Sequence, residues 1–240
     1  MHVVTPDLPE EVVGVDVETK STSPTAYVVS IASVSFNVRT LSQTSAFYRT
    51  IDPNDVDAVA CFTEDADTMK WWRGEGDPSY SPDPIAYKEA FSGTDKMPQV
   101  FKDLVDYLEP IRRKFKHVIT TRGPEFDIPI ISNVLRQCGL YEGIFRRYSA
   151  NDSDRTAERF TIAFAFDLDY DCEKVMWCKT KEYVPHMPAF DAGMSAYRTA
   201  RLYHLAYITR TYGYPKALEA AAIMRTGNYN GAKFLKELGE

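Results

Sequence analysis

The stretch EVVGVDVET, residues 11–19, decides the fold. Three valines alternate there with Gly14, Asp16 and Glu18, which is the period-two pattern of a strand with two unlike faces. Because successive strand side chains point to opposite faces, the two carboxylates emerge on the same face. Like charges at that spacing repel each other unless cations lie between them, and Mg²⁺ and Mn²⁺ prefer carboxylate oxygens. The pair is therefore a plausible metal site, although a solvated outer strand face would explain D-x-E equally well.

The segments that follow this strand predict an antiparallel meander. AYVVSIASVSFNV (residues 26–38) comes after a short polar turn and is rich in β-branched and apolar residues. SAFYRTI (residues 45–51) has the same character. Three strands in succession with turn-length connections favour antiparallel pairing.

Helices and one further strand are predicted beyond the loop-like stretch GEGDPSYSPDP. Apolar residues at helical spacing predict a helix at about 97–109, which Pro110 should end or kink. The short strand HVITTR, from His117, precedes a second helix marked by Ile128 to Cys138. A long helix is expected at about 190–211, with two short helices after it. A meander followed by helix–strand–helix predicts an α/β protein with a mixed sheet and helices on its faces.

Length and composition fit one domain. The chain has 240 residues, 44% hydrophobic and 26% charged, which is ordinary for a soluble globular protein with a sizeable core. We expect a single domain over residues 1–240, with its core at about 11–212 and a helical extension at 213–240. Residues 150–184 give the weakest pattern, because RTAERFTIAFAF could form a helix but has many β-branched and aromatic residues.

The formal net charge of -6 argues against a protein that holds nucleic acid by bulk positive charge. It leaves a nucleic-acid enzyme possible, since clustered carboxylates lower the formal charge and bound cations restore part of it. No apolar run approaches membrane-spanning length and the N-terminus has no signal pattern, so we expect a cytoplasmic protein without a membrane partner. The cysteines form no C-x-x-C pair, which disfavours zinc and suits a reduced intracellular state; they are Cys61, Cys138, Cys172 and Cys178.

Two further segments carry candidate site residues. Asp127 starts a predicted helix just after a strand, where α/β folds place functional groups, although a carboxylate favoured by the helix dipole explains it as well. His186 lies in a loop five positions before Asp191, so its imidazole can lean over a metal that Asp191 binds. A lone histidine is more often an ordinary surface or core residue. The combination of these residues is more specific than its parts.

Taken in order, these pieces resemble the three motifs of the DEDDh exonuclease superfamily. D-x-E-T is Asp16 to Thr19, the middle aspartate is Asp127 within EFDIPII, and H-x4-D is His186 to Asp191. The resemblance runs from about residue 11 to 212. Within the superfamily the chain is similar to the small exonucleases typified by exonuclease A of T-even phages and to the mycobacterial-type 3′-5′ exoribonucleases.

Two other segments bear on this resemblance. TMKWW, from Thr68 to Trp72, is similar to a T-x-x-W-W segment of that group, with two tryptophans that either pack a helix onto the sheet or stack on bases. The chain departs from its relatives at ANDSDRT, which leaves any substrate contact by Asn151, Asp152 or Arg155 unassigned.

The resemblance implies an RNase H-like fold, with a five-stranded mixed sheet flanked by helices. It implies two Mg²⁺ (or Mn²⁺) ions with Asp16, Glu18, Asp127 and Asp191 as metal residues, Asp127 acting through metal-bound waters. It also implies His186 as general base. The substrate would be nucleic acid with a free 3′ end, single-stranded DNA or possibly RNA, shortened to 5′-mononucleotides in a bacterium or a phage-infected host.

Several alternatives stay open on the sequence. The same chemistry could serve an exoribonuclease or a nuclease of short oligonucleotides, and a catalytically silent module could bind nucleic acid or a protein. The last helices could pack on the domain or form a homodimer. A basic run could touch phosphates but is more typical of a solvated helix end; its members are Arg112, Arg113, Lys114 and Lys116.

Overall fold

β1 (Glu11–Thr19) is the central strand of the sheet, and each of its residues is buried. The computed structural model describes residues 8–75, 81–114, 117–121, 124–141, 165–168 and 184–240. In this part of the chain the sheet has the order β3-β2-β1-β4, with strands β2 (Val28–Asn37), β3 (Gln43–Thr50) and β4 (His117–Thr121).

The pairing of these strands confirms the predicted meander and mixed sheet. β1 pairs with β2, and β2 with β3, in antiparallel fashion, whereas β4 runs parallel to β1 from Glu11↔His117 to Val15↔Thr121. Four strands are described in place of the five expected. The weakly patterned stretch 150–184 lies almost wholly outside the described residues.

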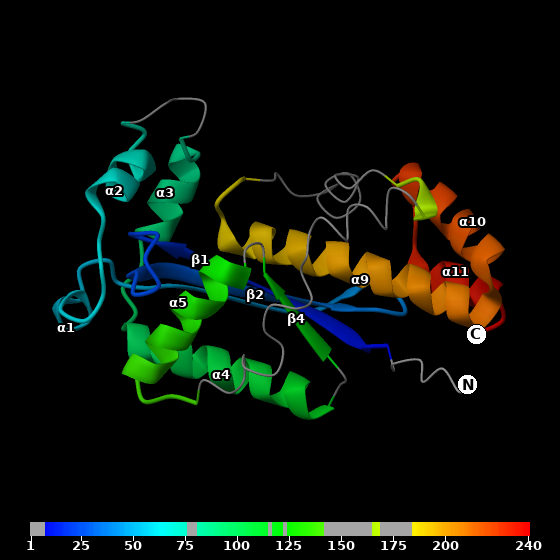
Figure 1. Cartoon of the computed structure of the whole chain (residues 1–240), viewed down its shortest axis with the longest axis horizontal. Coiled ribbons are helices and arrows are strands. Elements are labelled where there is room, and N and C mark those ends of the chain that lie inside the picture. The colour runs from blue at the N-terminus through cyan, green and yellow to red at the C-terminus, as the bar shows by residue number, and fades with distance from the viewer. Residues whose placement is uncertain (1–7, 76–80, 115–116, 122–123, 142–164, 169–183) are drawn as a thin grey trace.

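The two faces of the sheet carry different helices (Figure 1). Helices α4 (Met97–Lys114) and α5 (Pro124–Gln137) pack on the face formed by the alternating valines of β1. Helix α9 (Pro188–Tyr212) covers the opposite face, where Val12 of β1 joins its core. Both faces of β1 are therefore buried, because helices cover both sides of the sheet.

Gly14 lets α9 approach β1 closely. A Cβ at this position would lie 1.9 Å from the main-chain oxygen of Ala192 and 2.9 Å from the Cβ of Ala196. Only glycine fits such an approach of helix backbone to strand. Gly14 shares its face of β1 with Asp16 and Glu18, so the contact brings the first turns of α9 to the carboxylate-bearing face.

Three short helices between β3 and α4 were not predicted. They are α1 (Val56–Val59), α2 (Ala66–Trp72) and α3 (Pro84–Ala90). Each begins after an aspartate whose side chain accepts a hydrogen bond from a main-chain N–H of its first turn. The caps were the available signal, since helices this short show little periodicity.

Of the two outcomes expected at Pro110, an end of the helix is wrong, because α4 continues to Lys114. Leu108 and Ile111 on either side of the proline are 2% and 9% exposed, and their burial against the sheet holds the last turn in place despite the lost hydrogen bond. The remaining helices agree with expectation, and Gly139, with φ +67°, follows the end of α5.

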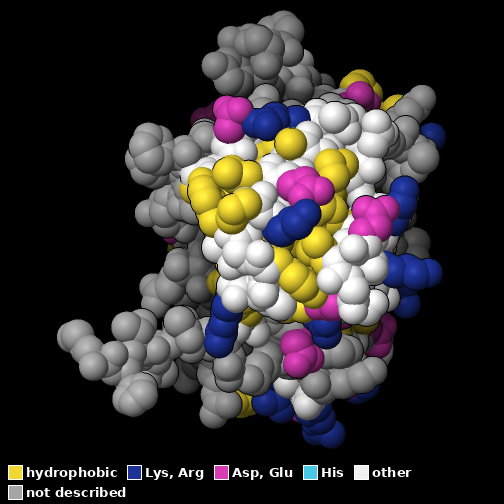
Figure 2. Space-filling model, turned by 90° about the vertical axis from the view of Figure 1, so that its right-hand side faces the viewer, with side chains coloured by type: hydrophobic (Ala, Val, Ile, Leu, Met, Phe, Trp, Pro, Cys, Tyr) yellow, Lys and Arg dark blue, Asp and Glu magenta, His cyan; other side chains and the backbone are white. Residues whose placement is uncertain are grey.

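The last residues form α10 (Tyr214–Arg225) and α11 (Gly231–Glu237), as predicted. Figure 2 shows this end of the molecule, where hydrophobic side chains gather but charged ones divide them. Tyr214 and Leu218 are 45% and 40% exposed. A homodimer through these helices stays a prediction. None of the helices in the described segments is both long and apolar enough to cross a membrane.

Candidate metal and active site

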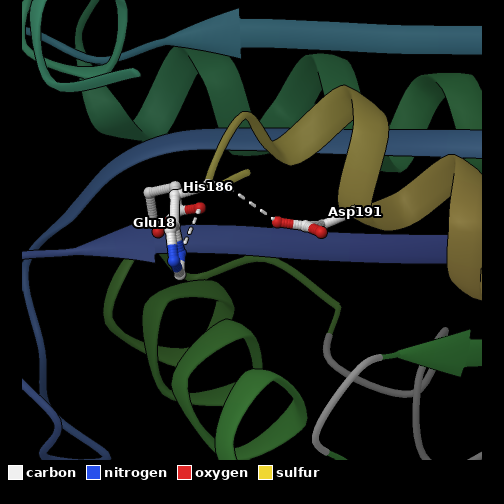
Figure 3. A group of neighbouring side chains, drawn as sticks. All are labelled: Glu18, His186 and Asp191. Atoms are coloured by element: carbon white, nitrogen blue, oxygen red, sulfur yellow. Dashed lines mark hydrogen bonds and ion pairs between the residues drawn. The ribbon is translucent and has the colours of Figure 1, made fainter. Parts of the chain in front are cut away.

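Three of the five predicted site residues meet at one end of the sheet. Glu18, His186 and Asp191 each offer one ligand atom, and these atoms all lie within 4.8 Å of one another. Nδ1 of His186 is 4.0 Å from Oε1 of Glu18, and its main-chain N–H donates to Oδ2 of Asp191 at 3.0 Å. Figure 3 shows the three side chains between β1 and the start of α9.

The topology explains this convergence. Within the described residues β1 continues beyond its last pair with β4, Val15↔Thr121, and Asp16 and Glu18 lie on this continuation. Asp127 lies in the first turn of α5 and Asp191 in the first turn of α9. Helix N-termini favour carboxylates because the unsatisfied N–H groups and the helix dipole are positive there.

All four predicted metal residues are buried. Asp16, Glu18, Asp127 and Asp191 are 6%, 8%, 3% and 4% exposed. Ionised carboxylates are costly to bury unless hydrogen bonds or cations compensate them. The carboxylate oxygens of Glu18 and Asp191 are donors that suit a hard divalent cation, and the imidazole of His186 lies beside them. The residues therefore fit a metal site, and Asp16 and Asp127 lie outside the compact group of three.

His186 has an unusual backbone conformation for a residue other than glycine, with φ +64°. Histidine adopts this left-handed region more readily than most side chains, and such residues often occur at functional sites. The His186 side chain is 35% exposed. Its ring meets that of Trp71 edge to face, with centroids 4.9 Å apart and planes at 88°.

A cavity of about 510 Å³ opens beside Glu18 and His186. Trp71, Trp72 and Phe126 give it aromatic walls, and the other lining residues are Thr19, Thr22, Asp65, Asp67 and Thr68. This volume falls in the range of small-ligand sites. Phe126 was missed by the sequence reasoning, because an aromatic residue beside the aspartate of EFDIPII has no signal of its own.

The two tryptophans of TMKWW have different surroundings. Trp72 is 2% exposed and donates from Nε1 to the main-chain oxygen of Thr19 at 2.8 Å, which confirms the packing role. Trp71 is half-buried and faces the cavity.

The other candidates add no further group to this site. Arg112 and Arg113 bind Glu109 on their own helix, at 2.6 and 2.8 Å, as expected of a solvated helix end. Lys116, the candidate contacts in ANDSDRT and the last two cysteines lie outside the described residues. Cys61 and Cys138 are free thiols.

The fold is that of DEDDh exonucleases. The nuclease domain of 3′hExo, a DEDDh family member bound to rAMP, is 14% identical over 81% of this chain and 92% of that chain, with a TM-score of 0.50. Product-bound exonuclease I is 10% identical over 88% of this chain, with a TM-score of 0.51. This chain covers only 45% of exonuclease I. No curated protein sequence matches significantly.

A family model gives the assignment at the level of sequence. Residues 11–182 match the 3′-5′ exoribonuclease Rv2179c-like domain. This stretch includes the meander of β1, β2 and β3, and also α5 with Asp127. The protein belongs to this family and is a 3′-5′ exonuclease.

Proposed function

We propose that this protein is a divalent-metal-dependent exonuclease that removes 5′-mononucleotides from the 3′ end of single-stranded nucleic acid, with RNA as its preferred polymer. The observation that carries the proposal is the group of Glu18, His186 and Asp191 at the edge of the cavity. The sequence alone placed DNA first. The exoribonuclease description of the family now favours RNA.

The carboxylates are the cation-holding part of the proposed site. Asp16, Glu18, Asp127 and Asp191 would hold two Mg²⁺ or Mn²⁺ ions. Bound cations would supply stabilisation of the charge on the phosphate and on the leaving 3′ oxygen, and would ease deprotonation of water. Asp127 and Asp191 lie in the first turns of α5 and α9, where the positive helix N-termini favour carboxylate side chains.

His186 is the proposed general base. Histidine is the side chain whose ordinary pKa lies nearest neutral pH, which suits it to take a proton from the attacking water. Its partly exposed ring can pass that proton to solvent, and its main-chain N–H is anchored on Asp191. Loss of a general base typically lowers the rate by about 10²–10⁴.

The cavity is the proposed seat of the terminal nucleoside. Its walls are aromatic, and the carboxylates of Asp65 and Asp67 are also among its lining groups. A polyanionic backbone is repelled by these carboxylates, while an uncharged sugar and base are accommodated. The scissile phosphate is thereby directed to the cation-holding carboxylates.

The test is a time course on 5′-labelled single-stranded RNA and DNA of one sequence, with Mg²⁺, Mn²⁺ or EDTA. We expect a ladder that shortens from the 3′ end, requires the cation and grows faster on RNA. Glu18→Gln should abolish it, whereas Asp106→Asn, a change at an exposed residue of α4, should not. Activity in EDTA equal to that in Mg²⁺, or no product from either polymer, would leave the silent binding module as the better explanation.

A further inference from the structure

Helix α2 contacts both chain segments that build the site. It begins after Asp65, whose carboxylate accepts from both N–H and Oγ1 of Thr68 at 2.8 Å. It ends with two adjacent tryptophans that point to different neighbours. This capped helix gives the end of β1 and the loop before α9 a common support.

Trp72 holds the end of β1. Its indole donates to the main-chain oxygen of Thr19, the residue after Glu18. The β1–β2 register shifts between Glu18 and Thr19, so the strand is irregular at this point. Behind it Trp72 packs on Phe91, the residue after α3, with ring centroids 5.4 Å apart. The indole hydrogen bond therefore fixes the backbone from which the Glu18 carboxylate extends.

Trp71 contacts the other segment. Its ring lies 4.9 Å from the imidazole of His186 with perpendicular planes, and 4.9 Å from the ring of Trp72. Edge-to-face pairs of this kind have a preferred geometry and restrict the rotation of both rings. A loop histidine with a partly exposed side chain has several rotamers available, and the contact selects the one that brings Nδ1 to within 4.0 Å of Glu18.

We propose that Trp71 is a positioning residue, whose ring sets the orientation of the His186 imidazole relative to Glu18. Its effect on kcat is exerted through His186, and is separate from any contact that its ring makes with the nucleoside as a wall of the cavity. The inference rests on the proposed function, since it takes His186 to be the base. Glu18 and His186, far apart in sequence, are held in register because adjacent residues of one helix contact both segments.

A double-mutant cycle separates the two roles open to Trp71. Trp71→Leu should lower kcat by about 10- to 100-fold, the usual cost of losing a residue that orients an active group, beyond any change in KM from the altered cavity wall. In a His186→Ala background the same change should lower kcat no further, because the group on which it acts is absent. A rise in KM at unchanged kcat, or an equal loss of kcat in both backgrounds, would overturn the proposal.

Two more variants guard against a loss of folding. Trp71→Phe retains a ring against His186 and should recover most of kcat. Phe62→Leu alters another half-buried aromatic side chain, which packs on Tyr27 away from His186, and should leave kcat within about twofold. Loss of kcat in this control as large as in Trp71→Leu would make the effect general and refute a specific role.

A readout without turnover tests the same contact. The chain has 4 histidines, so the imidazole signals of His186 can be assigned by their absence in His186→Ala. The ring current of Trp71 should displace these signals, and Trp71→Leu should return them towards those of a free histidine. No change would refute the contact. An inactive wild-type protein would instead refute the proposed function, and the spectra would still decide whether Trp71 orients the imidazole of His186.

Discussion

Substitution of Gly14 by alanine would test whether the close approach of α9 to β1 builds the site. The added Cβ lies 1.9 Å from the oxygen of Ala192, whereas ordinary contact begins at 3.4 Å. The helix backbone must therefore retreat by roughly 1.5 Å, and overpacking of this kind costs about 1–3 kcal/mol or more. Asp191, the neighbour of Ala192, moves with it and away from Glu18. Misplacement by about 1 Å can cost a hundredfold in rate, so we expect hydrolysis to fall by about 10²-fold or more.

The assay compares kcat, Mn²⁺ affinity by calorimetry and urea unfolding for Gly14→Ala. Gly231→Ala, at the start of α11, is a matched control. Its added Cβ would lie 2.4 Å from the main-chain oxygen of Thr40. The control should lose stability as well, yet keep Mn²⁺ affinity and kcat within about twofold. A folded Gly14→Ala protein with wild-type activity and Mn²⁺ affinity would refute the reasoning.

Three other predictions concern charge and hydrogen bonding. Asp191→Asn should abolish hydrolysis, yet melt at an equal or higher temperature in EDTA because one of several clustered like charges is gone; retained activity would contradict the metal assignment. Trp72→Phe leaves the buried oxygen of Thr19 without its donor, so urea unfolding should report a loss of about 1–3 kcal/mol, and an unchanged midpoint would count against the bond. Burial lowers the pKa of His204 from 6.5 to about 4, so below pH 6.5 the unfolded chain takes up a proton that the folded one does not. The free energy of unfolding should thus keep the full contribution of His204 above pH 6.5. It should fall by roughly 3 kcal/mol by pH 4. Urea titrations from pH 7 to 4.5 should show this slope in the wild type and a smaller one in His204→Gln; equal slopes would show that other groups cause it.

The parts of the fold that could be predicted from the sequence are those whose pattern lies in consecutive residues. The residues of β1 alternate with a period of two, and this period alone predicts that Asp16 and Glu18 lie on one face. α9 has 25 residues, long enough for its extent to be predicted without its neighbours. The family motifs then supplied the order of the site residues along the chain, and their metal and base roles stay predictions.

What escaped prediction depends on contacts between distant segments. The edge-to-face contact of Trp71 and His186 joins residues far apart in the chain, and no local pattern encodes it. Gly14 had a visible signal, since glycine inside a strand often marks a close backbone approach, but only the structure shows which helix approaches. Pro110 misled because local propensity ends helices at proline, whereas burial of its neighbours sustains this one.

The positions of β1 and α9 in the sequence determine when the site can form during synthesis of the chain. Glu18 and Asp191 are separated by roughly 170 residues. Translation adds about 5–20 residues per second, so roughly 10–35 s pass between the two. A nascent chain that does not yet include Asp191 lacks part of the group of Glu18, His186 and Asp191. The group of ligand atoms can therefore assemble only after the start of α9 has been synthesised.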